Sequence, residues 1–150
     1  MTVYGVTGSR EIQSDTQREL IHQVVWGSAF TISQMERLVH GCCVGVDELC
    51  ARIVVGEGPG ITAVVPPNRR LVSDDAYTFS DEIVVVPAGP DGYKRRNQEI
   101  VNRSDVLLAF PLYPEHHPQS RRSGTWQTVR LARRKGIRID IHILSEVARG

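Results

Sequence analysis

The chain has few cysteines and no long apolar segment. It holds three cysteines in 150 residues, and so small and odd a number excludes a disulfide framework and favours a reducing compartment. No hydrophobic run approaches the roughly 20 residues that a membrane-spanning helix requires. The first residues also lack the basic and apolar regions of a secretory signal. These absences predict a cytoplasmic protein with no membrane partner.

Two common phosphate-binding motifs are missing as well. The chain contains neither the GxGxxG pattern of dinucleotide-binding dehydrogenases nor the GxxxxGK[ST] loop of NTPases. Hydrophobic residues make up 41% of the chain and charged residues 23%, and these ordinary values exclude predominant disorder. The length suits one compact domain, so we expect residues 1–150 to form a single domain.

The net charge of +1 hides an uneven distribution. Residues 1–93 carry 6 basic and 12 acidic side chains, a net of −6, whereas residues 94–138 carry 11 basic and 3 acidic side chains, a net of +8. Such a basic stretch indicates an anionic partner, either phosphate or nucleic acid. The alternative is a solvated helix face, because Arg133, Arg134 and Lys135 stand near the end of a predicted helix, where the helix dipole favours cations.

Short apolar runs alternate with helical patterns along the chain. Runs of strand length, most of them rich in Val and Ile, cover residues 3–7, 37–40, 61–65, 83–86, 106–110 and 137–143. Helical patterns cover residues 16–30 with Asp15 as N-cap, 46–54, 93–103, and 125–135 with Gly136 as C-cap. The alternation predicts an α/β fold, a single three-layer Rossmann-like domain whose mostly parallel sheet has helices on both faces. Residues 66–82 and 111–122 are predicted to be long irregular loops.

Three of the predicted strands are followed by segments rich in glycine and hydroxyl side chains. In an open parallel sheet, ligands bind beyond the carboxyl ends of the strands. Glycine permits close approach of the backbone, and the unpaired N–H groups of a helix start suit phosphate. We therefore predict a nucleotide or phosphate site that contains Gly8, Ser9, Arg10, Gly41, Gly45, Asp47, Arg96, Asn97, Ser123, Gly124, Thr125 and Thr128.

Several of these side chains have a structural alternative. The alternative for Arg10 is an ion pair with a neighbouring carboxylate. The alternative for Arg96 is a position at a solvated helix end. Asp47 either binds a ribose hydroxyl or holds the glycine loop, as helix-capping Asp residues do. Thr128 either reaches the phosphate or bonds back to its own helix. Trp126 either stacks on a base or belongs to the core.

No metal site and no further cofactor are expected. His116 and His117 lie in a predicted loop, and no third ligand stands at a spacing typical of zinc. Cys42 and Cys43 are adjacent and cannot form a CxxC centre, so we expect them to pack beside the sheet.

Four segments resemble the SLOG superfamily of Rossmann-like proteins, which includes the DprA/Smf proteins, the LOG (Lonely Guy) phosphoribohydrolases and the small YspA-like proteins. Val6-Thr7-Gly8-Ser9-Arg10 is similar to the G-S-R of their first strand, and residues 40–47 to their G-x-x-x-G-x-D loop. Residues 96–101 are similar to the R-N-x-x-I segment of DprA, and residues 123–128 to its S-G-[ST]-x-x-T run. The matches run in order from residue 3 to about residue 143, and the length is closest to that of the YspA-like members.

The resemblance implies three functions, of which we expect the first. The first is binding of a nucleotide or a nucleotide derivative without catalysis. The second is binding of single-stranded DNA, as in DprA. The third is cleavage of nucleoside monophosphates, as in LOG enzymes, which pair an Arg with the Glu that ends their glycine motif. Arg96 matches that Arg, but Thr128 stands at the Glu position and a hydroxyl cannot replace a carboxylate, unless Glu99 or another carboxylate does so. Related folds often dimerise, so a homo-oligomer is expected.

Overall fold

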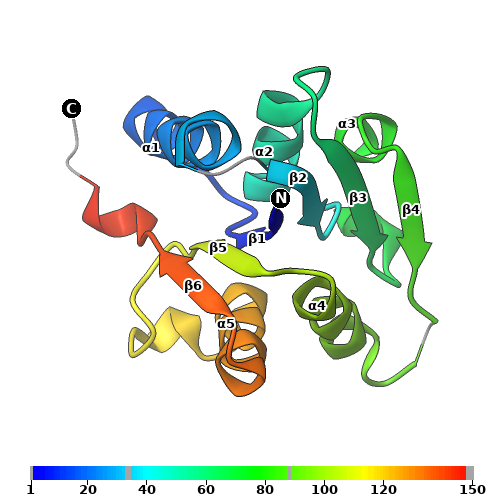
Figure 1. The fold of residues 1–150 in the computed structure, drawn as a ribbon. Helices are drawn as coiled ribbons and strands as arrows, with labels where there is room; N and C mark the ends of the chain where they lie inside the picture. The colour runs from blue at the N-terminus through cyan, green and yellow to red at the C-terminus, as the bar shows by residue number, and fades with distance from the viewer. Residues whose placement is uncertain (1, 33–34, 88, 148–150) are drawn as a thin grey trace.

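A six-stranded parallel sheet forms the centre of the molecule (Figure 1). A computed structural model of the chain describes residues 2–32, 35–87 and 89–147. The strand order is β4-β3-β2-β1-β5-β6, and every neighbouring pair is parallel. The strands are β1 (Thr2–Gly8), β2 (Met35–His40), β3 (Gly60–Val65), β4 (Glu82–Val85), β5 (Val106–Phe110) and β6 (Arg138–Ile141). The predicted α/β fold with a parallel sheet is confirmed.

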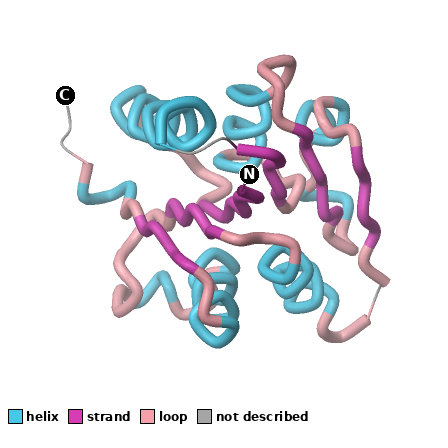
Figure 2. The backbone as a smooth tube through the Cα atoms, in the orientation of Figure 1, coloured by secondary structure: helices cyan, strands magenta, loops and turns pink. Residues whose placement is uncertain are grey.

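Helices cover both faces of this sheet, which gives three layers (Figure 2). One face packs against α1 (Asp15–Gly27), α2 (Val46–Val54) and the short α3 (Asp74–Thr78), and the other against α4 (Gly92–Asn102) and α5 (Gly124–Lys135). Successive strand side chains point to opposite faces, so Leu38 packs in the first core and Val39 in the second. Both side chains are fully buried, which explains why these strands show continuous apolar runs.

The ends of α1 differ from the prediction. The N-cap is Ser14 and not Asp15, because the Ser14 hydroxyl accepts the Gln17 N–H at 3.2 Å while Asp15 is already the first helical residue. The helix ends at Gly27 and continues as a π-helical turn over Ser28–Ile32. Both differences are local, since Ser and Asp are equally good caps and the hydrophobic pattern does not distinguish α from π geometry.

Two other segments also differ from the prediction. The loop predicted over 66–82 contains a 3₁₀ turn at Arg69–Leu71 and α3, whose N-cap Ser73 accepts the Ala76 N–H at 3.0 Å. The strand predicted over 137–143 is limited to β6 and is followed by a 3₁₀ turn at Leu144–Glu146. The predicted C-cap Gly136 is confirmed, with φ of 83° in the left-handed region.

The strand order reverses its direction between β1 and β5. The chain runs from β1 through β2 and β3 to β4 on one side, and then returns to place β5 on the other side of β1. The connections that leave β1 and β5 therefore diverge and open a crevice at the carboxyl edge of the sheet. Among residues 2–32, 35–87 and 89–147, no helix has the length and apolarity to span a bilayer.

Candidate functional site

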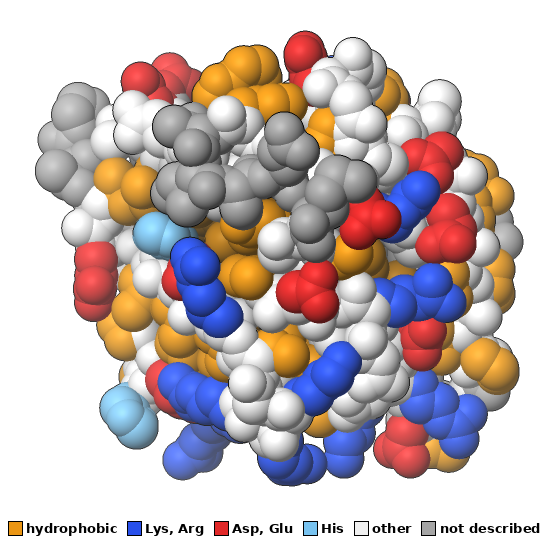
Figure 3. Space-filling model, in the orientation of Figure 1, with side chains coloured by type: hydrophobic (Ala, Val, Ile, Leu, Met, Phe, Trp, Pro, Cys, Tyr) orange, Lys and Arg blue, Asp and Glu red, His pale blue; other side chains and the backbone are white. Residues whose placement is uncertain are grey.

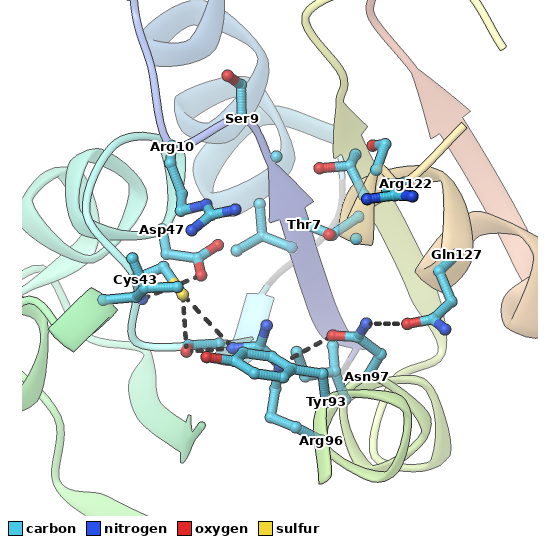
Figure 4. A pocket seen from close by; sticks show the side chains of 18 of the residues that line it. Thr7, Ser9, Arg10, Cys43, Asp47, Tyr93, Arg96, Asn97, Arg122 and Gln127 are labelled. Atoms are coloured by element: carbon cyan, nitrogen blue, oxygen red, sulfur yellow. Dashed lines mark hydrogen bonds between the residues drawn. The ribbon is translucent and has the colours of Figure 1, made fainter. Parts of the chain in front are cut away.

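A cleft of about 680 Å³ opens at this reversal point, between the end of β1 and the starts of α2, α4 and α5 (Figure 4). Ten of the twelve predicted site residues line it: Gly8, Ser9, Arg10, Gly41, Asp47, Arg96, Asn97, Ser123, Gly124 and Thr125. Gly45 and Thr128 do not line it. The structure therefore brings the three predicted loops together at one edge of the sheet.

The start of α5 offers unpaired backbone donors to this cleft. The Ser123 hydroxyl accepts the Trp126 N–H at 3.2 Å, and the Ser123 carbonyl accepts the Gln127 N–H at 3.0 Å. The N–H groups of Gly124 and Thr125 have no hydrogen-bond partner among the described residues. Since the positive end of the helix dipole lies at the same place, this is an environment that attracts an anion.

Two arginines extend freely beside the cleft. The side chains of Arg10 and Arg122 are exposed and line the cleft, and neither forms a hydrogen bond or an ion pair with another described residue. The alternative pairing of Arg10 with a neighbouring carboxylate is therefore not seen. The Ser9 hydroxyl, in contrast, is engaged, because it accepts the Glu11 N–H at 3.0 Å. Unpaired guanidinium groups at a cleft rim suit a phosphate, because each can donate two parallel hydrogen bonds to it.

Thr128 and Trp126 take the structural alternative. Thr128 is fully buried, and its hydroxyl donates to the Gly124 carbonyl at 2.8 Å within α5. Trp126 is 3% exposed, packs in the core with Val129, and its indole N–H donates to the Tyr113 carbonyl at 2.9 Å. Thr128 therefore offers no polar group to the cleft, and Trp126 offers no face to a base.

A chain of hydrogen bonds forms the floor of the cleft, from α5 across α4 to α2 (Figure 4). Asn97 donates from Nδ2 to Gln127 at 2.8 Å and accepts from Arg96 Nε at 2.8 Å. Arg96 Nη1 donates to the Gly41 carbonyl at 2.6 Å and contacts the Cys43 sulfur at 3.5 Å. The backbone N–H of Cys43 donates to Asp47 at 3.2 Å. Arg96 is 8% exposed and is held by these bonds, so it fixes the loop after β2 to α4.

Asp47 is the buried acid of the site. Its Oδ2 accepts the Cys43 N–H, whereas its Oδ1 is buried with no hydrogen-bond partner among the described residues. Burial raises the pKa of Asp47 to about 6, against the opposing effects of the Arg96 charge and the backbone N–H groups of Cys43 and Gly41. Asp47 thus holds the glycine loop, but it is not the helix cap, because the N-cap of α2 is Gly45.

Glycines at the cleft serve packing between elements. A Cβ on Gly8 would lie 2.5 Å from the Val46 side chain, so Gly8 lets α2 begin directly against β1. Gly45 has a φ of 89°, and a Cβ there would lie 2.5 Å from the Arg10 backbone. The Val46 N–H donates to the Ser9 carbonyl at 3.0 Å across the same contact. Both glycines bring two protein loops together, and of the two only Gly8 also lines the cleft.

His40 joins the end of β2 to α3. Burial, reinforced by the Arg96 charge, lowers the pKa of His40 to about 3, so the ring is neutral. Its Nδ1 accepts the Cys42 N–H at 2.9 Å, which leaves the proton on Nε2, 3.0 Å from the Ser80 hydroxyl. The Ser80 hydroxyl in turn donates to the Ala76 carbonyl at 2.7 Å. This network fixes the backbone that leads into the cleft.

The cysteines are buried thiols, as predicted. Burial raises the pKa of Cys42 to about 12 and also raises the pKa of Cys43, and the nearby Asp47 charge adds to both effects. Because the thiolate is the reactive form, neither group is suited to nucleophilic chemistry. Within the described ranges no three metal-ligating side chains gather. The predicted loop residue His117 accepts the Gln119 N–H at 3.1 Å and stacks on Tyr113.

Much of the basic segment is neutralised by its own surroundings. Figure 3 shows Lys and Arg side chains gathered over α4 and α5. Arg133 and Arg130 pair with Glu115 at 2.9 and 3.3 Å. Lys135 donates to the last carbonyls of α4, including that of Asn102 at 2.9 Å. These three cations are therefore engaged by other groups of the protein, and Lys135 caps the end of α4.

Four of the cleft residues that lie outside the sequence prediction offer a ring or a polar side chain from the starts of α4 and α5 or from the segment before α5. Tyr93 is 37% exposed at the start of α4, and its ring lies 5.8 Å from the Arg96 guanidinium carbon. Gln119, Arg122 and Gln127 also line the cleft. Gln127 stands one turn into α5 on the face of Gly124, and helical spacing from the predicted phosphate loop would have found it. Arg122 directly precedes the predicted phosphate loop, whereas no sequence pattern places Tyr93 or Gln119 at the cleft.

Comparisons with known proteins identify the fold. No protein-family model and no curated protein sequence matches the chain. The structure is similar to that of the molybdenum cofactor binding protein from Rippkaea orientalis, with a TM-score of 0.67 and 23% identity over 93% of this chain and 75% of that chain. It is also similar to DNA processing protein A (DprA) from Streptococcus pneumoniae, with a TM-score of 0.70 and 17% identity over 97% of this chain and 53% of that chain.

DprA from Helicobacter pylori, described for its single-stranded DNA binding mode, gives a TM-score of 0.69 at 14% identity, over 97% of this chain and 68% of that chain. The chain thus spans only about half the length of the Streptococcus pneumoniae DprA. At these identities the likeness concerns the backbone. The protein has a Rossmann-like α/β fold, which is similar to the folds of DprA and of a molybdenum cofactor binding protein.

Proposed function

We propose that this protein binds a nucleotide or a nucleotide derivative in the cleft, with a phosphate at the start of α5, and that it does not catalyse a reaction on the ligand. The observation that carries the proposal is the pair of unpartnered N–H groups at Gly124 and Thr125, which face a cleft at the reversal point of a parallel sheet. Phosphates bind at such helix starts, and ligands of this fold class bind at such reversal points.

The size and the lining of the cleft support a nucleotide. Its volume of about 680 Å³ lies within the range of small-molecule sites. The exposed ring of Tyr93 at the rim offers a face on which a base can stack. The free guanidinium groups of Arg10 and Arg122 offer charge to one or more phosphates.

The carboxylates of the cleft support binding rather than hydrolysis. Glycosidic cleavage generally uses a pair of carboxylates placed on either side of the bond. Of the cleft carboxylates, Asp47 is tied to the Cys43 N–H and Glu11 lies exposed on its loop. Glu99, the substitute considered above, pairs instead with Arg103 at 2.7 Å and does not line the cleft.

Calorimetric titration tests the proposal with a panel of the four ribonucleoside monophosphates, NAD, ADP-ribose and cyclic nucleotides. We expect at least one to bind. Arg122→Gln should weaken its affinity roughly tenfold, because a charge-assisted bond to phosphate is lost. Arg121→Gln is the matched control, since Arg121 is the exposed neighbour that does not line the cleft, and it should change the affinity less than about twofold. A panel without a ligand, or two variants with equal effects, would contradict the proposal.

Binding of single-stranded DNA is the second candidate, and the free side chains of Arg10 and Arg122 favour it. The pairing of Arg130, Arg133 and Lys135 within the protein weighs against it, because these cations are less available to a phosphate backbone. A single-stranded oligonucleotide that binds with an affinity falling steeply with salt would support DNA binding. An oligonucleotide that is not retarded in a gel at low salt would exclude it.

A further inference from the structure

The two ends of the cleft offer different hydrogen-bonding groups to a ligand. At one end are the unpartnered N–H groups of α5 and the guanidinium of Arg122, which attract an anion. At the other end is the carboxyl group of Asp47, which accepts hydrogen bonds and, when it is ionised, donates none; the exposed guanidinium of Arg10 lies beside it (Figure 4). Figure 4 shows Arg122 and Gln127 on one side of the cleft and Asp47 and Cys43 on the opposite side. A ligand that carries an anion at one end and hydrogen-bond donors near the other therefore suits the cleft.

The Asp47 carboxyl group has an acceptor to spare. Its loop-holding role uses Oδ2 alone, and Oδ1 is buried without a partner among the described residues. The charge of Arg96 favours the ionised form of Asp47, but Arg96 does not bond to Oδ1, because it directs Nη1 to Gly41 and Cys43 and Nε to Asn97. No ion pair of Asp47 is formed within the described ranges. A buried acceptor without a partner is rare in folded proteins and indicates a donor supplied from outside the chain.

The sugar of a nucleotide is the group that matches this acceptor. When the phosphate lies at α5 and the base stacks on Tyr93, the remaining polar part of the ligand is the ribose with its neighbouring hydroxyl groups. Hydroxyl groups donate readily to carboxylates. Asp47 lines the cleft, and the carboxyl torsion of Asp is broad and nearly two-fold, so a rotation about this torsion can present a carboxyl oxygen to the ligand.

We propose that Asp47 makes the cleft selective for ribonucleotides over deoxyribonucleotides, by accepting a hydrogen bond from a ribose hydroxyl. This inference rests on the proposed nucleotide-binding function. It has a consequence for the second candidate function, because a DNA strand has no 2′-hydroxyl and its internal 3′-oxygens are esterified. A DNA strand therefore presents no sugar donor to Asp47.

The experiment is a calorimetric titration of the wild-type protein with each ribonucleoside 5′-monophosphate and with its 2′-deoxy and 3′-deoxy counterparts, above neutral pH. For the ribonucleotide that binds, we expect at least one deoxy form to bind about 10- to 100-fold more weakly, because a charge-assisted hydrogen bond is lost. In Asp47→Asn, which keeps the shape of the side chain, the ratio between ribo and deoxy forms should fall to within about threefold.

Glu48→Gln is the matched control. Glu48 stands next to Asp47 in α2, bonds to Ser73 at 2.8 Å and does not line the cleft, so this variant removes the same charge and should keep the wild-type ratio. If ribo and deoxy forms bind the wild-type protein equally, the selectivity proposal is wrong while nucleotide binding stands. If no nucleotide binds, both proposals are wrong. Loss of the ratio in Glu48→Gln as well would show a general charge effect and would overturn the role of Asp47.

Discussion

At the scale of single residues, the cleft depends on glycines at which two segments of the chain lie too close together for a Cβ atom. Gly45 combines a φ of 89° with a contact to the backbone of Arg10, and Gly8 lies against Val46. These glycines set the entry of α2 beside β1. The backbone of the cleft is therefore fixed by packing within the protein, before any ligand is bound.

Gly45→Ala should lower the free energy of unfolding by about 2 to 4 kcal/mol, because the added Cβ meets a positive φ and the Arg10 backbone together. Urea denaturation measures this change. Gly27→Ala is the control, since a Cβ there meets nothing within 4 Å and the residue ends a helix; it should be neutral or slightly stabilising. Equal effects of the two substitutions would contradict the packing role of Gly45.

Asp47 carries a second prediction at this scale, which concerns pH. Burial raises its pKa from 3.8 to about 6. Between these values the folded state binds more protons than the unfolded state, so the contribution of Asp47 to stability falls as the pH rises from about 4 to about 6. Asp47→Asn removes this dependence. The stability of the variant relative to wild type should therefore increase by up to about 3 kcal/mol between pH 4 and pH 7.

Urea denaturation of both proteins at several pH values measures this difference. Comparing the two proteins cancels the effect of His40, whose lowered pKa makes stability fall as the pH drops from 6.5 toward 3. A relative stability that does not change with pH would show that Asp47 titrates normally in the folded protein.

At the scale of elements, the start of α5 is both a structural cap and the proposed phosphate site. The Ser123 side chain satisfies the Trp126 N–H, and this leaves two N–H groups for a ligand. The short α3 and the His40 network hold the opposite wall of the cleft. The two walls come from opposite faces of the sheet and meet only at its carboxyl edge.

Ser123→Ala should lower the free energy of unfolding by about 1 kcal/mol, since the α5 cap is lost. It should also weaken nucleotide affinity, because the first turn of α5 then frays. Ser14→Ala removes the cap of α1 on the other face of the sheet, and it should cost a similar amount of stability without changing nucleotide affinity. Chemical denaturation and calorimetry of the same samples check both parts. Equal losses of nucleotide affinity in the two variants would show that the start of α5 is not the phosphate site.

A comparison of the helices and strands with the prediction shows how much of the fold can be predicted from the sequence alone. Apolar runs of strand length place all six strands, and β5 has the predicted bounds. The parallel order then brings ten predicted residues to one cleft. The prediction cannot find α3, because five residues with two aspartates carry no helical period. It also misses the engagement of Arg96, because hydrogen bonds across elements leave no local pattern.

At the scale of the whole molecule, charge and apolar surface are unevenly distributed. Acidic and basic halves of the sequence meet at the cleft, where Asp47 lies on α2 and Arg122 just before α5. On α1, Trp26 is 41% exposed and stacks with His22, while Phe30 beyond it is 40% exposed. The expected homo-oligomer stays a prediction, and this aromatic row is an apolar surface that it can use.

A titration of ¹⁵N-labelled protein with a ribonucleoside monophosphate, followed by two-dimensional NMR, tests directly whether a nucleotide binds in the cleft with its phosphate at the start of α5. We expect the amide signals of Gly124 and Thr125 to shift most, together with those of Cys43 and Asp47 across the cleft. The signals of α1 should stay in place. Shifts confined to α1 or to the exposed end of α5, with Gly124 and Thr125 unchanged at saturation, would contradict the proposed site.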